Sequence, residues 1–165
     1  MLTIRPVLET DIPLLRSLCF KVWPQTYASI LSQAQIDYML ELMYSQATLQ
    51  KQMQKGTRFL FCYDDNEPCG FAAYQDHGDG KFKLDKIYVL PNQQGKGIGR
   101  FIITHVVNTI RPLGATVLQL QVNKQNVAKQ FYEKLGFVVA RAAVFDIGNG
   151  FVMDDYVMEL PVTPP

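Results

Sequence analysis

The sequence predicts an α+β protein built on one mixed, mostly antiparallel sheet flanked by helices. Three observations favour this class. β-like runs joined by tight turns follow a helical opening segment, strand and helix patterns alternate in the second half, and a glycine-rich run separates a β-like segment from an apolar helix. The predicted order is β-α-α-β-β-β-α-β-α-β-β. It forms one domain over residues 1–160, followed by a frayed tail at 161–165.

The opening segment predicts one strand and two helices. Residues 2–7 alternate in polarity as a half-buried strand does. Apolar residues then recur at helical spacing over 12–23, and Pro24 is expected to end that helix because its ring lacks an N–H. A second helix is predicted from Ser32 to Lys55, where Gly56 stops it.

Three β-rich runs come next. Residues 57–63 and 68–76 flank Asp64-Asp65-Asn66-Glu67, whose composition is typical of a turn, so the sequence predicts a hairpin. Residues 77–80 form a second tight turn that leads into a strand ending at Leu90.

The second half alternates strands with helices. The glycine-rich run opens an apolar helix, and residues 115–122 then alternate cleanly as a strand. A short helix stopped by Gly136 follows. Two β runs, 137–146 and 151–160, complete the predicted sheet.

Composition narrows the functional classes. The 165 residues carry a formal net charge of +1, are 48% apolar and 19% charged, and show no basic stripe that could neutralise several phosphates. We therefore expect no nucleic-acid partner. No apolar run approaches the length of a membrane span and no leader pattern opens the chain, so we expect a cytoplasmic protein with no membrane partner. The three cysteines lack metal-ligand spacing, so we expect free thiols and no metal.

The run Gln93-Gln94-Gly95-Lys96-Gly97-Ile98-Gly99-Arg100 is the most informative stretch of the chain. Alternate glycines leave main-chain N–H groups open to an anion, and the helix that begins there adds unpaired donors and a partial positive charge. Lys96 and Arg100 add cationic donors. The pattern predicts a pyrophosphate cradle, and the alternative is a glycine turn that binds nothing.

The spacing within this run selects among phosphate-binding motifs. It lacks the Gly-Lys-Ser/Thr of a P-loop, and neither glycine frame completes Gly-x-Gly-x-x-Gly. Gln94-x-x-Gly97-x-Gly99 does resemble the coenzyme A signature of the GNAT superfamily of N-acetyltransferases. Residues 123–137 also resemble that family's Asn-x-x-Ala-x-x-Phe-Tyr-x-x-x-Gly-Phe block, at the usual distance downstream.

The resemblance extends over essentially the whole chain and implies the GNAT fold with acetyl-CoA as cosubstrate. Its fourth and fifth strands are expected to splay apart, so that the fourth pairs with the pantetheine arm. A main-chain N–H there, that of Val89, would polarise the thioester carbonyl. The cofactor-binding residues implied by position are Ile87, Tyr88, Val89, Gln94, Gly95, Lys96, Gly97, Ile98, Gly99, Arg100 and Asn126.

Acetyl transfer to an amine needs a general acid and a general base. Tyr132 matches the family tyrosine near the thioester sulfur and is the predicted acid, although a core tyrosine would fit the same pattern. Many relatives carry a base glutamate where this chain has Lys83. Asp85, two residues along the strand, is the predicted base, with a solvated carboxylate as the alternative. Three weaker candidates are His77, Asp155 and Glu159.

The acceptor pocket is expected between the first two helices and the last hairpin. Its candidate substrate-binding residues are Trp23, Tyr27 and Tyr38, which could equally pack a helix junction. Asp154 and Asp155 could attract a cationic amine. The predicted function is acetyl transfer to a small amine, polyamine or peptide amine. The alternatives are a non-catalytic acyl-CoA sensor and an adaptor for protein interaction, and the resemblance leaves a homodimer open.

Overall fold

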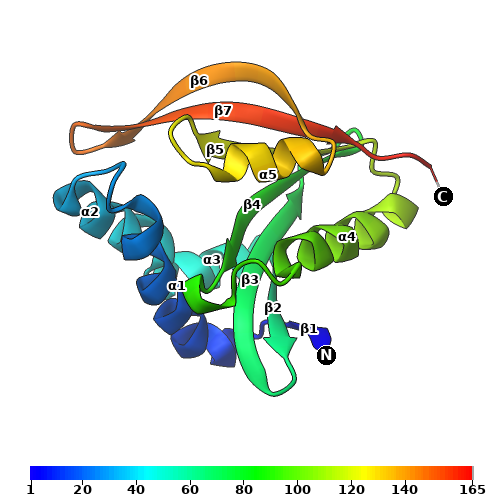
Figure 1. The fold of residues 1–165 in the computed structure, drawn as a ribbon, viewed down its shortest axis with the longest axis horizontal. Coiled ribbons are helices and arrows are strands. Elements are labelled where there is room, and N and C mark those ends of the chain that lie inside the picture. The colour runs from blue at the N-terminus through cyan, green and yellow to red at the C-terminus, as the bar shows by residue number, and fades with distance from the viewer. Residues whose placement is uncertain (165) are drawn as a thin grey trace.

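A seven-stranded sheet runs through the structure, a computed structural model that describes residues 1–164 (Figure 1). The strand order is β1-β2-β3-β4-β5-β7-β6, and every neighbouring pair is antiparallel except β4 and β5. The strands are β1 (Leu2–Pro6), β2 (Arg58–Asp64), β3 (Glu67–Asp76), β4 (Lys81–Val89), β5 (Val117–Asn123), β6 (Val138–Gly148) and β7 (Phe151–Pro161). This confirms the predicted mixed, mostly antiparallel sheet.

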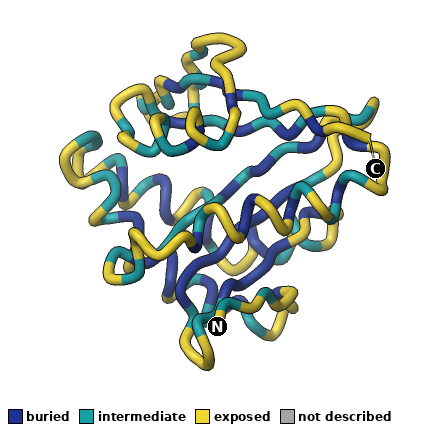
Figure 2. Tube along the Cα trace, turned by 45° about the vertical axis from the view of Figure 1, so that its right-hand side comes forward, coloured by how far each residue is buried: buried dark blue, intermediate teal, exposed yellow. Residues whose placement is uncertain are grey.

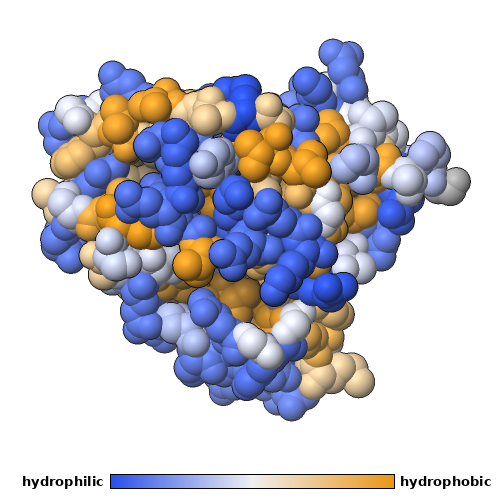
Figure 3. Space-filling model, turned by 45° about the horizontal axis from the view of Figure 1, so that its top comes forward, coloured by the Kyte–Doolittle hydropathy of each residue, from blue (hydrophilic) through white to orange (hydrophobic). Residues whose placement is uncertain are grey.

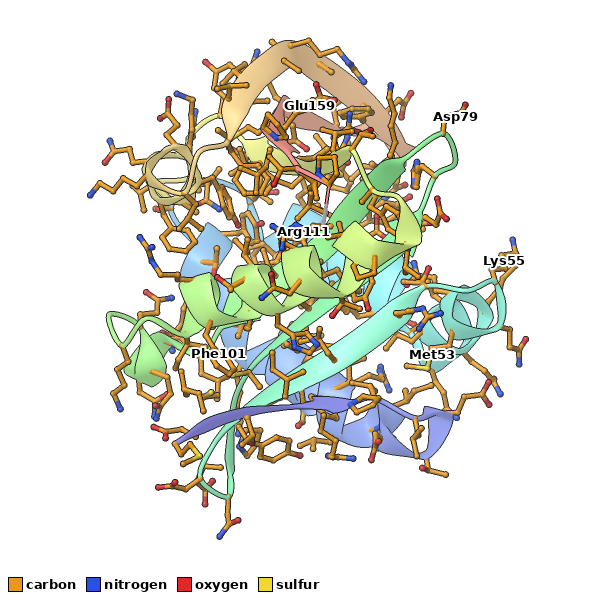
Figure 4. The ribbon with its side chains drawn as sticks, turned by 90° about the vertical axis from the view of Figure 1, so that its right-hand side faces the viewer. Met53, Lys55, Asp79, Phe101, Arg111 and Glu159 are labelled. Atoms are coloured by element: carbon orange, nitrogen blue, oxygen red, sulfur yellow. The ribbon has the colours of Figure 1, made fainter. Side chains whose placement is uncertain are left out.

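Helices cover both faces of the sheet. One face carries α1 (Ile12–Tyr27), α2 (Gln33–Tyr44) and α3 (Gln46–Gln54), and the other carries α4 (Ile98–Ile110) and α5 (Ala128–Lys134). Figure 4 shows α4 lying across its face of the sheet, with Phe101 in its first turn and Arg111 just beyond its last residue.

Two apolar cores fill the space between these layers. One joins α4 and α5 to the sheet, and the other joins α1, α2 and α3 to the opposite face. The central strands are accordingly the most buried part of the chain, whereas β6 is exposed along most of its length (Figure 2). At its centre the sheet is therefore packed on both faces. At its edge, β6 pairs with β7 alone.

The parallel pair of strands separates after three residues. Pairing between β4 and β5 ends at Lys83 and Gln119, so the rest of each strand lacks the other as a partner. On the other side of β4, the Leu90 N–H donates to the Cys69 carbonyl at 2.9 Å. Because antiparallel ladders alternate, the main-chain groups of Val89 and Ile87 then point away from β3, into the gap. This is the splayed geometry that the resemblance implied.

A β-bulge interrupts β4 beside this gap. Ala73 pairs with Lys86 and Tyr74 pairs with Leu84, so Asp85 is an extra residue on β4. A bulge resets the alternation of side chains along its strand. Asp85 and Lys86 consequently both lie on the face covered by α1, α2 and α3.

Two helix predictions are wrong in detail. Helix α1 continues through Pro24 to Tyr27, because Tyr27 packs on the buried Trp23 with ring centroids 4.5 Å apart. The predicted helix from Ser32 to Lys55 is broken at Ser45, whose backbone is extended and whose hydroxyl accepts the Thr48 N–H. Tertiary packing extends the first helix, and an N-cap divides the second.

The tail is more ordered than predicted. Pro161 ends β7, and Val162 is buried with its N–H donating to the Thr116 carbonyl at 2.9 Å. The prediction of fraying from residue 161 is therefore wrong for these two residues, because an apolar side chain and a ladder-type hydrogen bond hold them. Its last residue, Pro165, lies outside the described residues.

Candidate functional site

The glycine run forms an open turn at the start of α4. Gly95 and Gly97 adopt positive φ angles of 83° and 77°, in the left-handed region that side chains disfavour. A Cβ at either position would meet nothing within 4 Å, so the turn faces open space. Gly97 is the N-cap of α4 and supplies no side chain to its first N–H groups. These donors are available to an anion.

Gly99 has a different role in the same turn. A Cβ there would lie 2.9 Å from Cζ of Phe131, a residue of α5. The missing side chain therefore lets the first turn of α4 pack directly against α5. This contact holds the turn close to the strand gap.

Two cavities lie against the sheet. The larger, about 610 Å³, connects this turn with the gap between β4 and β5. Nine of the predicted cofactor-binding residues line it: Ile87, Tyr88, Val89, Gln94, Gly95, Gly97, Ile98, Gly99 and Asn126. Lining residues outside the predicted cofactor-binding set include Gln25, Thr26, Gln121, Val127 and Phe131, of which Val127 and Phe131 belong to the second motif block. The alternation of residues 117–123 offered a signal for Gln121, which shares its strand face with Gln119.

Two predicted cofactor-binding residues lie outside this wall. Lys96 and Arg100 are exposed and are not among the residues that line the cavity. The Lys96 ammonium instead donates to Gln93 Oε1 at 3.0 Å. The cavity wall at the turn therefore contains neither of these two cationic side chains.

Tyr132 lies in the wall of the larger cavity at the end of α5. Its ring packs between Phe131 and Phe137, with centroid distances of 5.5 and 5.7 Å. Its hydroxyl has no hydrogen-bond partner within residues 1–164, and burial raises the pKa of Tyr132 well above its usual value. The phenol therefore keeps its proton throughout the physiological range.

Asn126 lies in the same wall, two residues before the first residue of the short helix α5. Its side-chain oxygen accepts the Ala128 N–H at 2.9 Å. This hydrogen bond fixes the position of Asn126 at the start of α5 and thereby orients it against the cavity.

A smaller cavity, about 280 Å³, lies between α1, α2, α3 and the strands β4, β5 and β7. Trp23 and Tyr27, two of the candidate substrate-binding residues, line it. Tyr38 does not: its hydroxyl donates to the Ile147 carbonyl at 2.7 Å, and its ring packs on Phe151. The expectation for Tyr38 is wrong because this side chain joins α2 to the β6–β7 hairpin.

The two cavities meet at a shared wall. It comprises Tyr27, Asp85, Lys86, Tyr88 and Gln121. The hydroxyl groups of Tyr27 and Tyr88 lie 3.1 Å apart, which connects α1 to β4 at this point. The two cavities therefore adjoin at this wall.

Two aspartates line the smaller cavity, and they differ in their hydrogen-bond partners. Asp85 accepts a hydrogen bond from Gln75 Nε2 at 2.6 Å and lies 3.9 Å from the Lys83 ammonium. Asp155, on β7, is only 2% exposed and has no hydrogen-bond partner within residues 1–164. Burial, and then the neighbouring Asp154, raise the pKa of Asp155 to about 6.

Lys86 is the charged residue that sequence reasoning missed. Its side chain is buried, its ammonium donates to Gln52 Oε1 at 3.1 Å, and burial lowers its pKa. Regular alternation from Lys83 would have placed Lys86 on the opposite face. The bulge at Asp85 left no signal in the sequence that could have corrected this.

The remaining charged candidates lie away from both cavities. His77 is exposed in its turn, Glu159 accepts a hydrogen bond from Gln119, and Asp154 pairs with Lys124 at 2.9 Å. Within residues 1–164, no three histidine, cysteine, aspartate or glutamate residues gather into a group that could hold a metal ion. None of the helices described over that range combines the length and apolarity needed to cross a bilayer.

Comparison with known proteins agrees with this architecture. The sequence model of the family described as "Acetyltransferase (GNAT) domain" matches residues 27–160. The chain belongs to the GNAT acetyltransferase family. The crystal structure of PaiA N-acetyltransferase from Thermoplasma acidophilum in complex with coenzyme A superposes with a TM-score of 0.82, at 25% identity over 98% of this chain and 99% of that one.

Curated relatives differ in what they acetylate. A spermidine N(1)-acetyltransferase of Thermoplasma acidophilum is 26% identical over 92% of this chain and 94% of its own length. The peptidyl-lysine N-acetyltransferase YjaB of Salmonella typhimurium is 34% identical over 53% of this chain. The chain spans 55% of the length of YjaB and 58% of that of a ribosomal-protein alanine N-acetyltransferase of Haemophilus influenzae.

Proposed function

We propose that this protein transfers an acetyl group from acetyl-CoA to a primary amine. The observation that carries the proposal is the meeting of two cavities at one wall. The larger contains the glycine turn and the unpaired edge of β4, and the smaller contains two carboxylates. The first suits a thioester cosubstrate with a diphosphate, and the second suits an amine.

The larger cavity fits coenzyme A along its length. The open amides at Gly95, Gly97 and the start of α4 would hold the diphosphate, because the bare turn faces open space at each positive-φ glycine. The free edge of β4 beyond Lys83 would pair with the amides of the pantetheine arm, as an added strand does. Asn126 would contact the cofactor from the opposite wall.

Two groups would stabilise the charge that develops during transfer. The Val89 N–H points into the gap, where it can donate to the thioester oxygen as that oxygen becomes negative. The Tyr132 hydroxyl has a free proton to donate toward the leaving sulfur. Because an ordinary thiol has a pKa of about 8.5, below that of this phenol, the phenol keeps its proton and stabilises the leaving thiolate by hydrogen bonding, and the thiolate takes its proton from water after release.

Asp155 is a better candidate for the general base than Asp85, the residue that the sequence indicated. The carboxylate of Asp85 already accepts a hydrogen bond from Gln75 and forms an ion pair with Lys83. The Asp155 carboxylate has no hydrogen-bond partner within residues 1–164. Its pKa of about 6 lies close to neutral pH, so the group is ionised there and still basic enough to accept a proton. Asp85 would then hold Lys83 and Gln75 in place beside the acceptor.

An assay of thiol release tests the proposal. The purified protein is given acetyl-CoA and a panel of primary amines, beginning with spermidine, aminoglycosides, amino acids and lysyl peptides. Turnover with at least one amine, faster than hydrolysis without amine, is expected. Binding of coenzyme A without turnover of any amine would instead indicate an acyl-CoA sensor and overturn the proposal.

The setting and assembly of the enzyme form part of the proposal. Three free, buried cysteines support a reducing, cytoplasmic environment. The edge strand β6 exposes Val138, Val139 and Val144, which supports a homodimer formed along this strand. Figure 3, tilted so that the top of the molecule comes forward, shows hydrophobic and hydrophilic residues intermixed on that face.

A further inference from the structure

The smaller cavity holds four charged side chains, two of each sign. Lys83 and Asp85 approach each other at 3.9 Å and form one pair. Lys86 and Asp155 have no oppositely charged partner within 4.0 Å among residues 1–164. The cavity therefore presents one unpaired cation and one unpaired anion to whatever enters it.

Lys86 is poorly satisfied for a buried ammonium. Only 8% of the residue is exposed, and the only oxygen to which it donates within the described chain is Gln52 Oε1, at 3.1 Å. The ring faces of Tyr44 and Phe59, each 5.3 Å away, attract the charge without offering an oxygen acceptor. An ammonium has three donors, so two remain for a ligand.

A buried cation without a counter-ion is costly, and an anionic ligand would offset that cost. Lys86 lines both cavities, and its partner Gln52 and neighbour Tyr44 line the smaller one. Asp155 contributes the opposite charge from β7, at another wall of the smaller cavity. The arrangement matches a molecule that carries both signs of charge.

We propose that the acceptor is a small amino acid or similar amine with a carboxylate, which Lys86 binds. The amine is directed to Asp155 and the carboxylate to the two free donors of Lys86. Met39, Met43 and Met153 line the same cavity and provide an adaptable apolar surface for the rest of the molecule. This inference rests on the proposed acetyl transfer and specifies its substrate class.

The charge balance of the cavity disfavours a polyamine. Its four charged lining residues sum to zero, and a polyamine would bring two or more positive charges beside Lys83 and Lys86. A peptide amine remains compatible only where a carboxylate lies close to the amine. The acceptor therefore differs in charge from spermidine, which one relative is named for.

Matched acceptors test this inference. L-Methionine is compared with 3-(methylthio)propylamine, which lacks only the carboxylate, and 6-aminohexanoate is compared with hexylamine. The carboxylate-bearing member of at least one pair is expected to show a kcat/KM about 10- to 100-fold higher, the effect of a charge-assisted hydrogen-bonded contact. Equal or faster turnover of both plain amines would overturn the inference.

Variants assign the preference to Lys86. Lys86→Met is expected to lose the preference for the carboxylate, so that the two members of each acceptor pair show kcat/KM values within about threefold of each other. Lys86→Arg should retain the preference. Lys81→Met, at an exposed position on the same strand, is the matched control and should behave as wild type. A full preference in folded Lys86→Met would contradict the assignment.

A binding measurement separates the inference from the proposed function. Calorimetry with 3-(methylthio)propionate, which has the carboxylate but no amine, is expected to show binding to wild type in the presence of coenzyme A. Lys86→Met should bind it at least tenfold more weakly. Acid binding without turnover of any amine would overturn acetyl transfer and leave the anion site standing. Turnover of plain amines without acid binding would overturn only the anion site. If Lys86→Met does not fold, the acceptor pairs and acid binding in wild type still decide the question.

Discussion

At the scale of single residues, burial determines what the site's side chains can do. Tyr132 and Asp155 both carry raised pKa values, because each is buried without a partner of opposite charge. The two raised pKa values have opposite consequences. Tyr132 keeps its proton and can donate a hydrogen bond, whereas Asp155 becomes a better proton acceptor near neutral pH. Burial is the largest cause of both raised pKa values, and the sequence motifs do not indicate burial at either position.

Tyr132→Phe is expected to lower kcat about a hundred- to ten-thousand-fold, the range of a lost general-acid contact. The affinity for acetyl-CoA should change little, because the ring keeps its packing against Phe131 and Phe137. Steady-state thiol release and calorimetric binding measure the two effects. Unchanged kcat would remove Tyr132 from the mechanism.

Asp155→Asn is expected to stabilise the fold while reducing activity. The pKa of Asp155 is about 6 in the folded chain, above the value of 3.8 for an unperturbed aspartate, so the ionised form costs folding free energy at neutral pH. The variant should gain about 1–3 kcal/mol at pH 8, because the folded chain no longer holds this charge.

The pH dependence has a defined sign. The destabilising effect of Asp155 should diminish as the pH falls below about 6 and vanish near pH 4, so the gain of Asp155→Asn should fade over the same range. Wild-type kcat/KM should decline below about pH 6 as the base is protonated. Denaturant unfolding at pH 4 and 8 measures the first effect. A variant equally stabilised at both pH values would contradict this account.

At the scale of elements, the sequence indicated the strands and the glycine turn because each has a local signature. The turn requires backbone angles that Gly95 and Gly97 adopt readily, and the strands alternate in polarity. The bulge at Asp85 has no such signature, so Lys86 was not recognised. The break at Ser45 and the continuation through Pro24 arise from capping and packing, which outweigh local propensity.

Gly99→Ala tests the packing of α4 against α5. The added Cβ would lie 2.9 Å from Phe131 Cζ, so the ring must move. We expect a loss of about 1–3 kcal/mol in stability and weaker binding of coenzyme A, since Phe131 lines the larger cavity. Thr104→Ala, at an exposed position of α4, is the control and should change neither. Thermal unfolding and calorimetry give the comparison, and a neutral Gly99→Ala would show that the two helices are not tightly coupled.

At the scale of the whole molecule, the function arises from how the sheet divides. The two helical layers hold the sheet from both faces, and the separation of β4 from β5 opens the larger cavity at its centre. The smaller cavity lies on the side of α1, α2 and α3, and the two meet at Tyr27 and Tyr88. The overall architecture and the wall of the larger cavity follow from the motifs. The wall of the smaller cavity depends on long-range packing, which explains why Tyr38 was misplaced.

Calorimetric titration with coenzyme A tests the central claim most directly. Wild type should bind coenzyme A, and pantetheine, which lacks the diphosphate, should bind far more weakly. Gly97→Val should lose affinity, because a β-branched side chain disfavours the φ of 77° that holds the open turn. No heat of binding with coenzyme A, from protein shown to be folded by circular dichroism, would contradict the account.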